Sequence, residues 1–272
     1  MNQYLELGFL GLAVGTVGTL IGAGGGFVLV PVLLIMYPDY GPETITSISL
    51  AAVFFNATSG SVAYARMKRI DYKSGLLFAA ATIPGAILGA LSTNLIPRTI
   101  FNVGFGVLMV AAGIYLFFCR EKTTKPSAAE AERHCVRTVT EKNGTTHTFS
   151  YDLGLGIKWS LLVGYLSSLL GIGGGIIHVP ILVRLLNFPV HVATATSHFV
   201  LAIMALTGTI VHIATGTFSG SAVDRTLALA VGVTVGAQLG AKLSDRIHGK
   251  WIIRSLAAAL ALAGLRILML AR

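Results

Sequence analysis

Two glycine-rich stretches decide the fold of this chain: Leu20-Ile21-Gly22-Ala23-Gly24-Gly25-Gly26 and Leu169-Leu170-Gly171-Ile172-Gly173-Gly174-Gly175. Each stretch runs into a short apolar segment that contains a proline, Val30-Pro31-Val32-Leu33 in the first case and Val179-Pro180-Ile181-Leu182 in the second. The same pattern therefore occurs twice, once in each half of the chain.

Two further matches follow in the same order. Thr46-Ser47 in the first half corresponds to Thr196-Ser197 in the second. Later, Gly85-Ala86-Ile87-Leu88-Gly89-Ala90 corresponds to Gly236-Ala237-Gln238-Leu239-Gly240-Ala241. Matches in one order and with nearly equal spacing indicate an internal duplication.

The composition places the chain in a membrane. Its 272 residues are 54% hydrophobic and 11% charged, whereas soluble proteins carry about 25% charged residues. A soluble fold of this size would have too little polar surface to cover its core, so the expected outer solvent is lipid. The basic residues behind the net charge of +9 form short clusters between apolar runs. That pattern orients membrane proteins and argues against nucleic-acid binding.

Most apolar runs approach the roughly 20 residues that a membrane-spanning helix needs. The runs at 27–37 and 175–187 are shorter, and each follows a glycine stretch, so each glycine stretch is predicted to be the tip of a helical hairpin. Whether these hairpins cross the membrane fully or stop partway is left open. The apolar runs lie at 4–21, 27–37, 44–65, 72–93 and 99–118, and after a polar stretch at 153–171, 175–187, 191–214, 226–243 and 251–271.

Lysine and arginine predict the orientation of the two halves. The loop 66–73 is strongly basic and therefore predicted to be cytoplasmic, whereas its counterpart 215–221 has no charge. The next loop reverses the bias: Lys242, Arg246 and Lys250 cluster in the second half, against one arginine in 92–98. Equivalent loops are thus expected on opposite sides, so the repeats are inverted, as in many secondary transporters. Both termini are predicted to lie outside the cytoplasm.

The predicted fold is an all-α integral membrane protein with two inverted repeats, residues 1–118 and 153–272. Each repeat is a glycine-tipped helical hairpin followed by three transmembrane helices. Residues 119–152 form a cytoplasmic connector, in which alternating residues around Asn143-Gly144 predict a small β-hairpin. His134, Cys135 and His147 lie in this connector without the spacing of a metal site. No metal and no cofactor are expected, and the segment is interpreted as an exposed connector.

The glycine tips are the first candidates for a binding site. Gly24-Gly25-Gly26 and Gly173-Gly174-Gly175 each open a short helix. A helix N-terminus carries unpaired N–H groups and about half a positive charge, so it binds anions without lysine or arginine. The alternative is a tight turn in which glycine only permits close packing. Inverted repeats bring both tips together near the membrane midplane, which favours the anion site.

Polar side chains in the apolar runs complete the candidate set. Thr46-Ser47 and Thr196-Ser197 each lie near a helix start, although hydroxyls in helices often bond their own backbone. His178 and His198 have no histidine counterpart in the first half, and an ionisable group inside a membrane is a functional candidate by default. Gln238 is a further neutral donor. If His198 contacts the anion, binding should strengthen as pH falls through roughly 6.5.

Two function classes are disfavoured by what the predicted helices lack. No aspartate or glutamate lies centrally in any of them, so coupling through membrane carboxylates is not expected. No set of nucleophile, base and orienting residue converges, so an enzyme is not expected.

The glycine stretches with Pro31 and Pro180, the segment Ala195-Thr196-Ser197 and the segment 236–241 resemble the sulfite exporter family TauE/SafE. The connector 119–152 departs from the family pattern in its length. The resemblance implies a secondary transporter of the bacterial cytoplasmic membrane for small sulfur-containing anions, sulfite or an organosulfonate such as sulfoacetate. An anion channel, or a membrane component of sulfur metabolism with a reactive histidine, remains an alternative. The expected partners are the small anion and the lipid bilayer, a homodimer is left open, and nucleic acid is excluded.

Overall fold

The computed structural model describes residues 3–118, 135–218, 220–244, 246–247 and 249–270 of the chain. The first half contains α1 (Gln3–Ile21), α2 (Gly26–Met36), α3 (Pro42–Arg66), α4 (Tyr72–Thr93) and α5 (Arg98–Phe118). The second half contains α7 (Leu153–Leu170), α8 (Gly175–Arg184), α9 (Val190–Ala214), α10 (Ser221–Ser244) and α11 (Gly249–Leu270). The strands β1 (Cys135–Thr140) and β2 (Thr146–Tyr151) lie between the halves. Cys119 and His134 of the connector lie outside the described residues.

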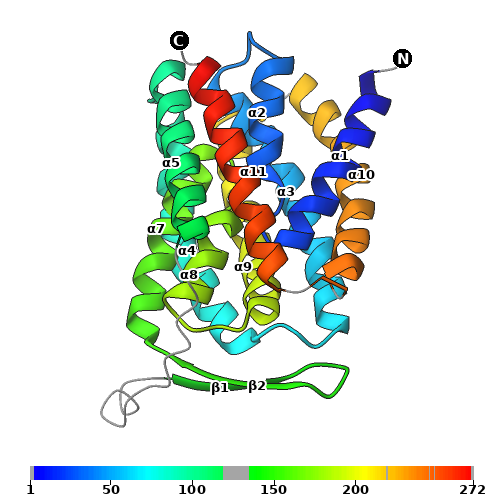
Figure 1. The fold of residues 1–272 in the computed structure, drawn as a ribbon. Coiled ribbons are helices and arrows are strands. Elements are labelled where there is room, and N and C mark those ends of the chain that lie inside the picture. The colour runs from blue at the N-terminus through cyan, green and yellow to red at the C-terminus, as the bar shows by residue number, and fades with distance from the viewer. Residues whose placement is uncertain (1–2, 119–134, 219, 245, 248, 271–272) are drawn as a thin grey trace.

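The protein is a helical membrane bundle, as the sequence predicts. Among the described residues, six helices are long and apolar enough to cross a membrane: α1, α3, α4, α7, α9 and α10. Figure 1 shows the start of α1 and the end of α11 at one end of the bundle and the β-strands at the other. The inverted orientation of the two halves in a bilayer stays a prediction.

Helices from the two halves pack against each other in matching pairs. Helix α1 packs along α10, and α7 packs along α4. Glycine makes both contacts close: a Cβ added at Gly85 would lie 2.8 Å from the backbone nitrogen of Tyr165, and one at Gly236 would lie 2.8 Å from that of Thr16. Small residues allow this approach because association in lipid depends on close packing. These glycines therefore serve close packing between the two halves.

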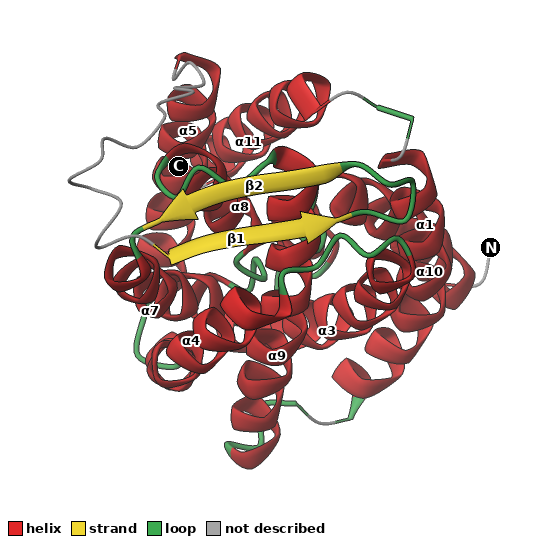
Figure 2. Cartoon of the chain, turned by 90° about the horizontal axis from the view of Figure 1, so that it is seen from below, coloured by secondary structure: helices red, strands yellow, loops and turns green. Residues whose placement is uncertain are grey.

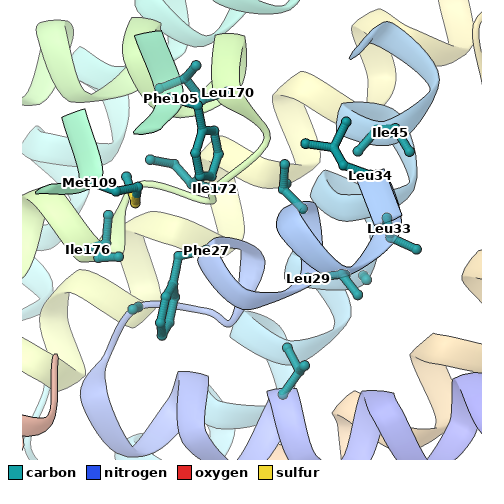
Figure 3. Close-up of a cluster of buried hydrophobic side chains, with 14 of the residues drawn as sticks. Phe27, Leu29, Leu33, Leu34, Ile45, Phe105, Met109, Leu170, Ile172 and Ile176 are labelled. Atoms are coloured by element: carbon teal, nitrogen blue, oxygen red, sulfur yellow. The ribbon is translucent and has the colours of Figure 1, made fainter. Parts of the chain in front are cut away.

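The second arm of each hairpin is too short to cross a bilayer. Helix α2 has 11 residues and α8 has 10. At about 1.5 Å per residue each is roughly 15 Å long, half the thickness of a hydrocarbon core. Both tips therefore end inside the bundle, where apolar side chains of both halves enclose them. Phe27 of α2, Leu170 and Ile172 of the second tip, and Phe105 of α5 belong to one buried cluster (Figure 3).

The two strands form an antiparallel hairpin in which Val139 pairs with His147 and Arg137 with Phe149. Asp152 joins β2 to α7 and caps that helix, because its side chain accepts a hydrogen bond from the backbone nitrogen of Leu155 at 3.0 Å. Seen from the end of the bundle, the strands cross its middle (Figure 2). Phe149 and Tyr151 are buried against the bundle. The expectation of an exposed connector is therefore wrong for these residues, because β2 places aromatic rings on the inner face.

Candidate functional site

The two glycine tips lie against each other. A Cβ added at Gly26 would lie 2.6 Å from the carbonyl oxygen of Ile172, and one at Gly175 would lie 2.7 Å from the Cα of Ala23. Gly25 and Gly174 have φ values of 83° and 75°, which L side chains rarely adopt. Glycine is thus required here for two reasons, the left-handed backbone and the direct contact between the tips.

Some tip amides are used within the turns, and others are not. The N–H groups of Ala23 and Gly24 donate to the carbonyl of Gly18, at 2.8 and 3.1 Å. The N–H group of Gly175, which opens α8, donates to the carbonyl of Gly173 at 2.9 Å, and no side chain caps either short helix. Within the described chain, six other N–H groups at the two helix starts have no backbone carbonyl as acceptor. These unpaired donors belong to Gly25, Gly26 and Phe27 at the first tip and to Gly173, Gly174 and Ile176 at the second.

Helices α3 and α9 cross the tips at matching positions. Thr46 of α3 lies against Gly171, and Thr194 of α9 lies against Gly22. Relative to the tips, the counterpart of Thr46 is therefore Thr194, whereas the repeated sequence pattern predicts Thr196. In each case the Cα and the Cγ2 methyl group of the threonine lie beside the first glycine of the opposite tip.

The predicted hydroxyl residues have different surroundings. Thr46 donates to the carbonyl of Glu43 at 3.0 Å, and Ser47 donates to that of Thr44 at 2.8 Å, so both bond their own helix. Thr196 accepts a hydrogen bond from the backbone nitrogen of Asp71 at 3.0 Å. Ser197 is buried, and its hydroxyl has no partner. Of the four, only Ser197 has a hydroxyl without any hydrogen-bond partner.

A small cavity, too narrow to admit a water molecule, adjoins the second tip. It brings together four residues that the sequence predicts, and its walls are Gly174, Gly175, His178 and Ser197 with Thr82, Val163, Val200, Leu201 and Met204. The ring nitrogen Nε2 of His178 lies 3.3 Å from the hydroxyl oxygen of Ser160. Close by, the hydroxyl of Ser167 also lacks a partner, and its oxygen would lie 3.0 Å from a Cβ added at Gly174.

His198 lies in a separate polar cluster beside the first tip. Its Nε2 is 3.1 Å from Oδ1 of Asn56 and 3.2 Å from the hydroxyl of Thr19. The Thr19 hydroxyl donates to the same Asn56 oxygen at 2.8 Å, and Tyr64 donates to the carbonyl of Thr19 at 2.7 Å. A Cβ added at Gly60 would lie 2.6 Å from the His198 ring. The structure thus separates His198 from His178.

Gln238 bonds no member of either cluster. Its side-chain nitrogen donates to the carbonyl and the hydroxyl of Ser59, at 2.7 and 2.8 Å, and so ties α10 to α3. Sequence reasoning also missed Thr82 and Ser167, because a single hydroxyl in an apolar helix carries no signal until the fold shows what it faces. Among the described residues, no group of three or more His, Cys, Asp or Glu side chains is arranged to hold a metal ion.

Comparison with known proteins agrees with this membrane architecture. Residues 7–267 match the family described as Sulfite exporter TauE/SafE. The chain is 34% identical to the probable membrane transporter protein YunE of Bacillus subtilis, over 98% of this chain and 97% of that protein. It is 26% identical to a probable membrane transporter protein of Methanocaldococcus jannaschii, over 96% and 93% of the two chains. No solved structure matches it significantly. A match over nearly the whole length shows that the chain belongs to the TauE/SafE family of membrane transporters.

Proposed function

We propose that the protein is a secondary transporter of small sulfur-containing anions, sulfite or an organosulfonate such as sulfoacetate, across the cytoplasmic membrane. The substrate class follows from the family description, Sulfite exporter TauE/SafE. The anion is held by the glycine tips, and the observation that carries this proposal is their unpaired backbone N–H groups at the starts of α2 and α8. Two facing helix N-termini supply partial positive charge where a free lysine or arginine would be costly to bury.

The cavity at the second tip supplies the side-chain part of the proposed site. Ser197 and Ser167 have unpaired hydroxyls, and His178 adds a ring that bonds as donor or acceptor. A buried polar group without a partner costs free energy, so such groups mark a place where a ligand restores the missing hydrogen bond. The cavity is too narrow for a water molecule as it stands, so we propose that it opens by small movements of the tip and α9 when the anion binds.

Ser197→Ala tests the site without disturbing the fold. The change removes a hydroxyl that bonds nothing in the protein, so unfolding stability should stay the same or rise slightly. Affinity for sulfoacetate should fall, by about tenfold or less, because one hydrogen bond of roughly 1 kcal/mol is lost. Isothermal titration of purified protein measures the affinity.

The matched control is Thr209→Ala, which removes a hydroxyl from the same helix that bonds the carbonyl of Ala205 at 2.8 Å. Its affinity for sulfoacetate should equal that of the wild type. If Ser197→Ala binds as tightly as Thr209→Ala, the cavity is not part of the anion site. Counterflow of labelled sulfoacetate in proteoliposomes then separates a transporter from a channel, since only a transporter exchanges substrate against a gradient.

A further inference from the structure

The β1–β2 hairpin is docked on the bundle by two reciprocal ion pairs. Glu141 of the hairpin accepts a hydrogen bond from Nε of Arg69 in the α3–α4 loop at 2.8 Å, and both side chains are almost fully buried. Conversely, Asp71 of the same loop lies 3.8 Å from Nε of Arg137 in β1. Each partner thus offers one carboxylate and one arginine to the other.

The same loop is connected to the candidate site. The backbone nitrogen of Asp71 donates to the hydroxyl of Thr196 in α9 at 3.0 Å. The Asp71 side chain also accepts from the hydroxyl of Ser74, which in turn bonds the hydroxyl of Tyr151 in β2. Asp71 therefore links the hairpin to α9, the helix that carries Ser197, because its side chain bonds toward Tyr151 through Ser74 and its backbone nitrogen bonds Thr196.

Aromatic rings make a second connection. The Phe149 and Tyr151 rings lie 4.3 and 5.0 Å from that of Phe188, between α8 and α9. Phe78 of α4 lies 5.8 Å from Tyr151 on one side and 5.8 Å from His178 on the other. The side chain of Phe78 thus lies between Tyr151 of the hairpin and His178 of the cavity at the second glycine tip.

We propose that this hairpin is a gate that closes the transport site toward the side on which the connector lies, predicted to be the cytoplasm. The inference rests on the proposed function. The hairpin lies across the middle of the end of the bundle (Figure 2). Its side chains pack in one buried cluster with residues at the starts of α4 and α9 and at the end of α8. Ion pairs suit a gate because their charges regain water when the contact opens, whereas a purely apolar contact has no such compensation.

The gate is tested first by access to the site, with no substrate present. In a background of Cys119→Ser and Cys135→Ser, the reporter is Ser197→Cys, labelled from the cytoplasmic side by a membrane-impermeant maleimide in inside-out vesicles. Adding Arg137→Gln and Glu141→Gln removes one hairpin charge from each ion pair, and labelling should become about tenfold faster. The control pair is Thr138→Ala and Thr148→Ala, whose hydroxyls lie on the exposed face of the hairpin. An unchanged rate in the Arg137/Glu141 variant, or an equal rise in the control, overturns the gate.

Locking the hairpin is the complementary experiment. The backbone nitrogen of Lys142 donates to the carbonyl of Met67, which directly follows α3, at 3.0 Å. Met67→Cys with Lys142→Cys in the same cysteine-free background therefore joins the docked hairpin to the α3–α4 loop by a disulfide. Oxidised protein should still bind sulfoacetate but lose counterflow, and reduction should restore it. Full counterflow with the disulfide formed would show that the hairpin does not gate. If the wild type carries no sulfoacetate at all, the proposed substrate fails, while the labelling rates still decide the gate.

Discussion

The two buried histidines differ in their neighbours, and this gives the sharpest prediction for single residues. His178 lies in the cavity wall, while His198 is bonded to Asn56 and Thr19 beside the other tip. Replacing His178 with leucine should lower anion affinity about tenfold, since a hydrogen bond and a polar wall are lost. Replacing His198 with leucine should instead cost about 1–3 kcal/mol of unfolding free energy, because buried partners lose a hydrogen bond.

Titration calorimetry with sulfoacetate and thermal unfolding in detergent separate the two effects. The ligand should be a sulfonate, which is ionised throughout the pH range and so does not itself titrate. If His198→Leu abolishes binding while His178→Leu binds normally, the anion lies at the first tip and the cavity assignment is wrong. In that case the next measurement is the affinity as a function of pH, because a contact between His198 and the anion predicts tighter binding at lower pH.

At the scale of helices, matching glycines hold α4 to α7 and α1 to α10. A valine at Gly85 or at Gly236 would push its side chain into the backbone of the facing helix. Overpacking of this kind costs about 1–3 kcal/mol, so each variant should unfold at a lower temperature. Gly104→Val on α5 is the matched control, because no atom lies within 4 Å of its added Cβ. Equal stability of Gly85→Val and Gly104→Val would contradict the close helix contact.

The docking of the hairpin should depend on pH. Burial alone would raise the pKa of Glu141, but hydrogen bonds from Arg69 and His147 and their charges outweigh burial and hold this pKa below its ordinary value of 4.5. The ionised form is thus the one that docks. Its contribution is fully present above pH 4.5 and is lost as the pH falls through the lower pKa of the docked state.

Limited proteolysis of the hairpin by pepsin measures this dependence. In the wild type, protection of residues 135–151 from pepsin should decrease as the pH is lowered below 4.5. In Glu141→Gln, protection should be weaker than in the wild type and should not change with pH. Since pepsin itself changes activity with pH, cleavage of an unfolded reference peptide serves as the rate standard. A hairpin equally protected at pH 3 and pH 6 would show that ionisation of Glu141 does not stabilise the docked hairpin.

For the whole molecule, the prediction concerns sidedness. The start of α1 and the end of α11 lie at the end of the bundle opposite the β-hairpin (Figure 1). The basic loop 66–73 approaches the hairpin through Arg69 and Asp71, which places the positive charges of the first half at the hairpin end. Positive loops face the cytoplasm, so we expect the hairpin inside and both termini outside.

A fluorescent protein that matures only in the cytoplasm reports this arrangement. Fused after the C-terminus it should stay dark, and inserted within residues 119–134 it should fluoresce. Expression of both fusions is checked by antibody. A bright C-terminal fusion would contradict the inverted topology.

The sequence by itself determined the membrane class, the helical hairpins and the family. Lipid imposes long apolar helices, and the repeated glycine stretches mark where they break, so these features are readable from local composition and spacing. The prediction of a β-hairpin around Asn143-Gly144 rests on equally local signals, and strands are found there.

Only the tertiary structure decided which side chains meet. It placed Ser197 and His178 in one cavity with Thr82, and His198 in another cluster with Asn56 and Thr19. It also bonded the hydroxyls of Thr46 and Ser47 to their own helix and tied Gln238 to Ser59. A hydroxyl in an apolar helix has the same local sequence signal whether it faces its own backbone, another helix or a cavity. The choice depends on the rotation and register of packed helices, which distant contacts such as those between the two glycine tips determine.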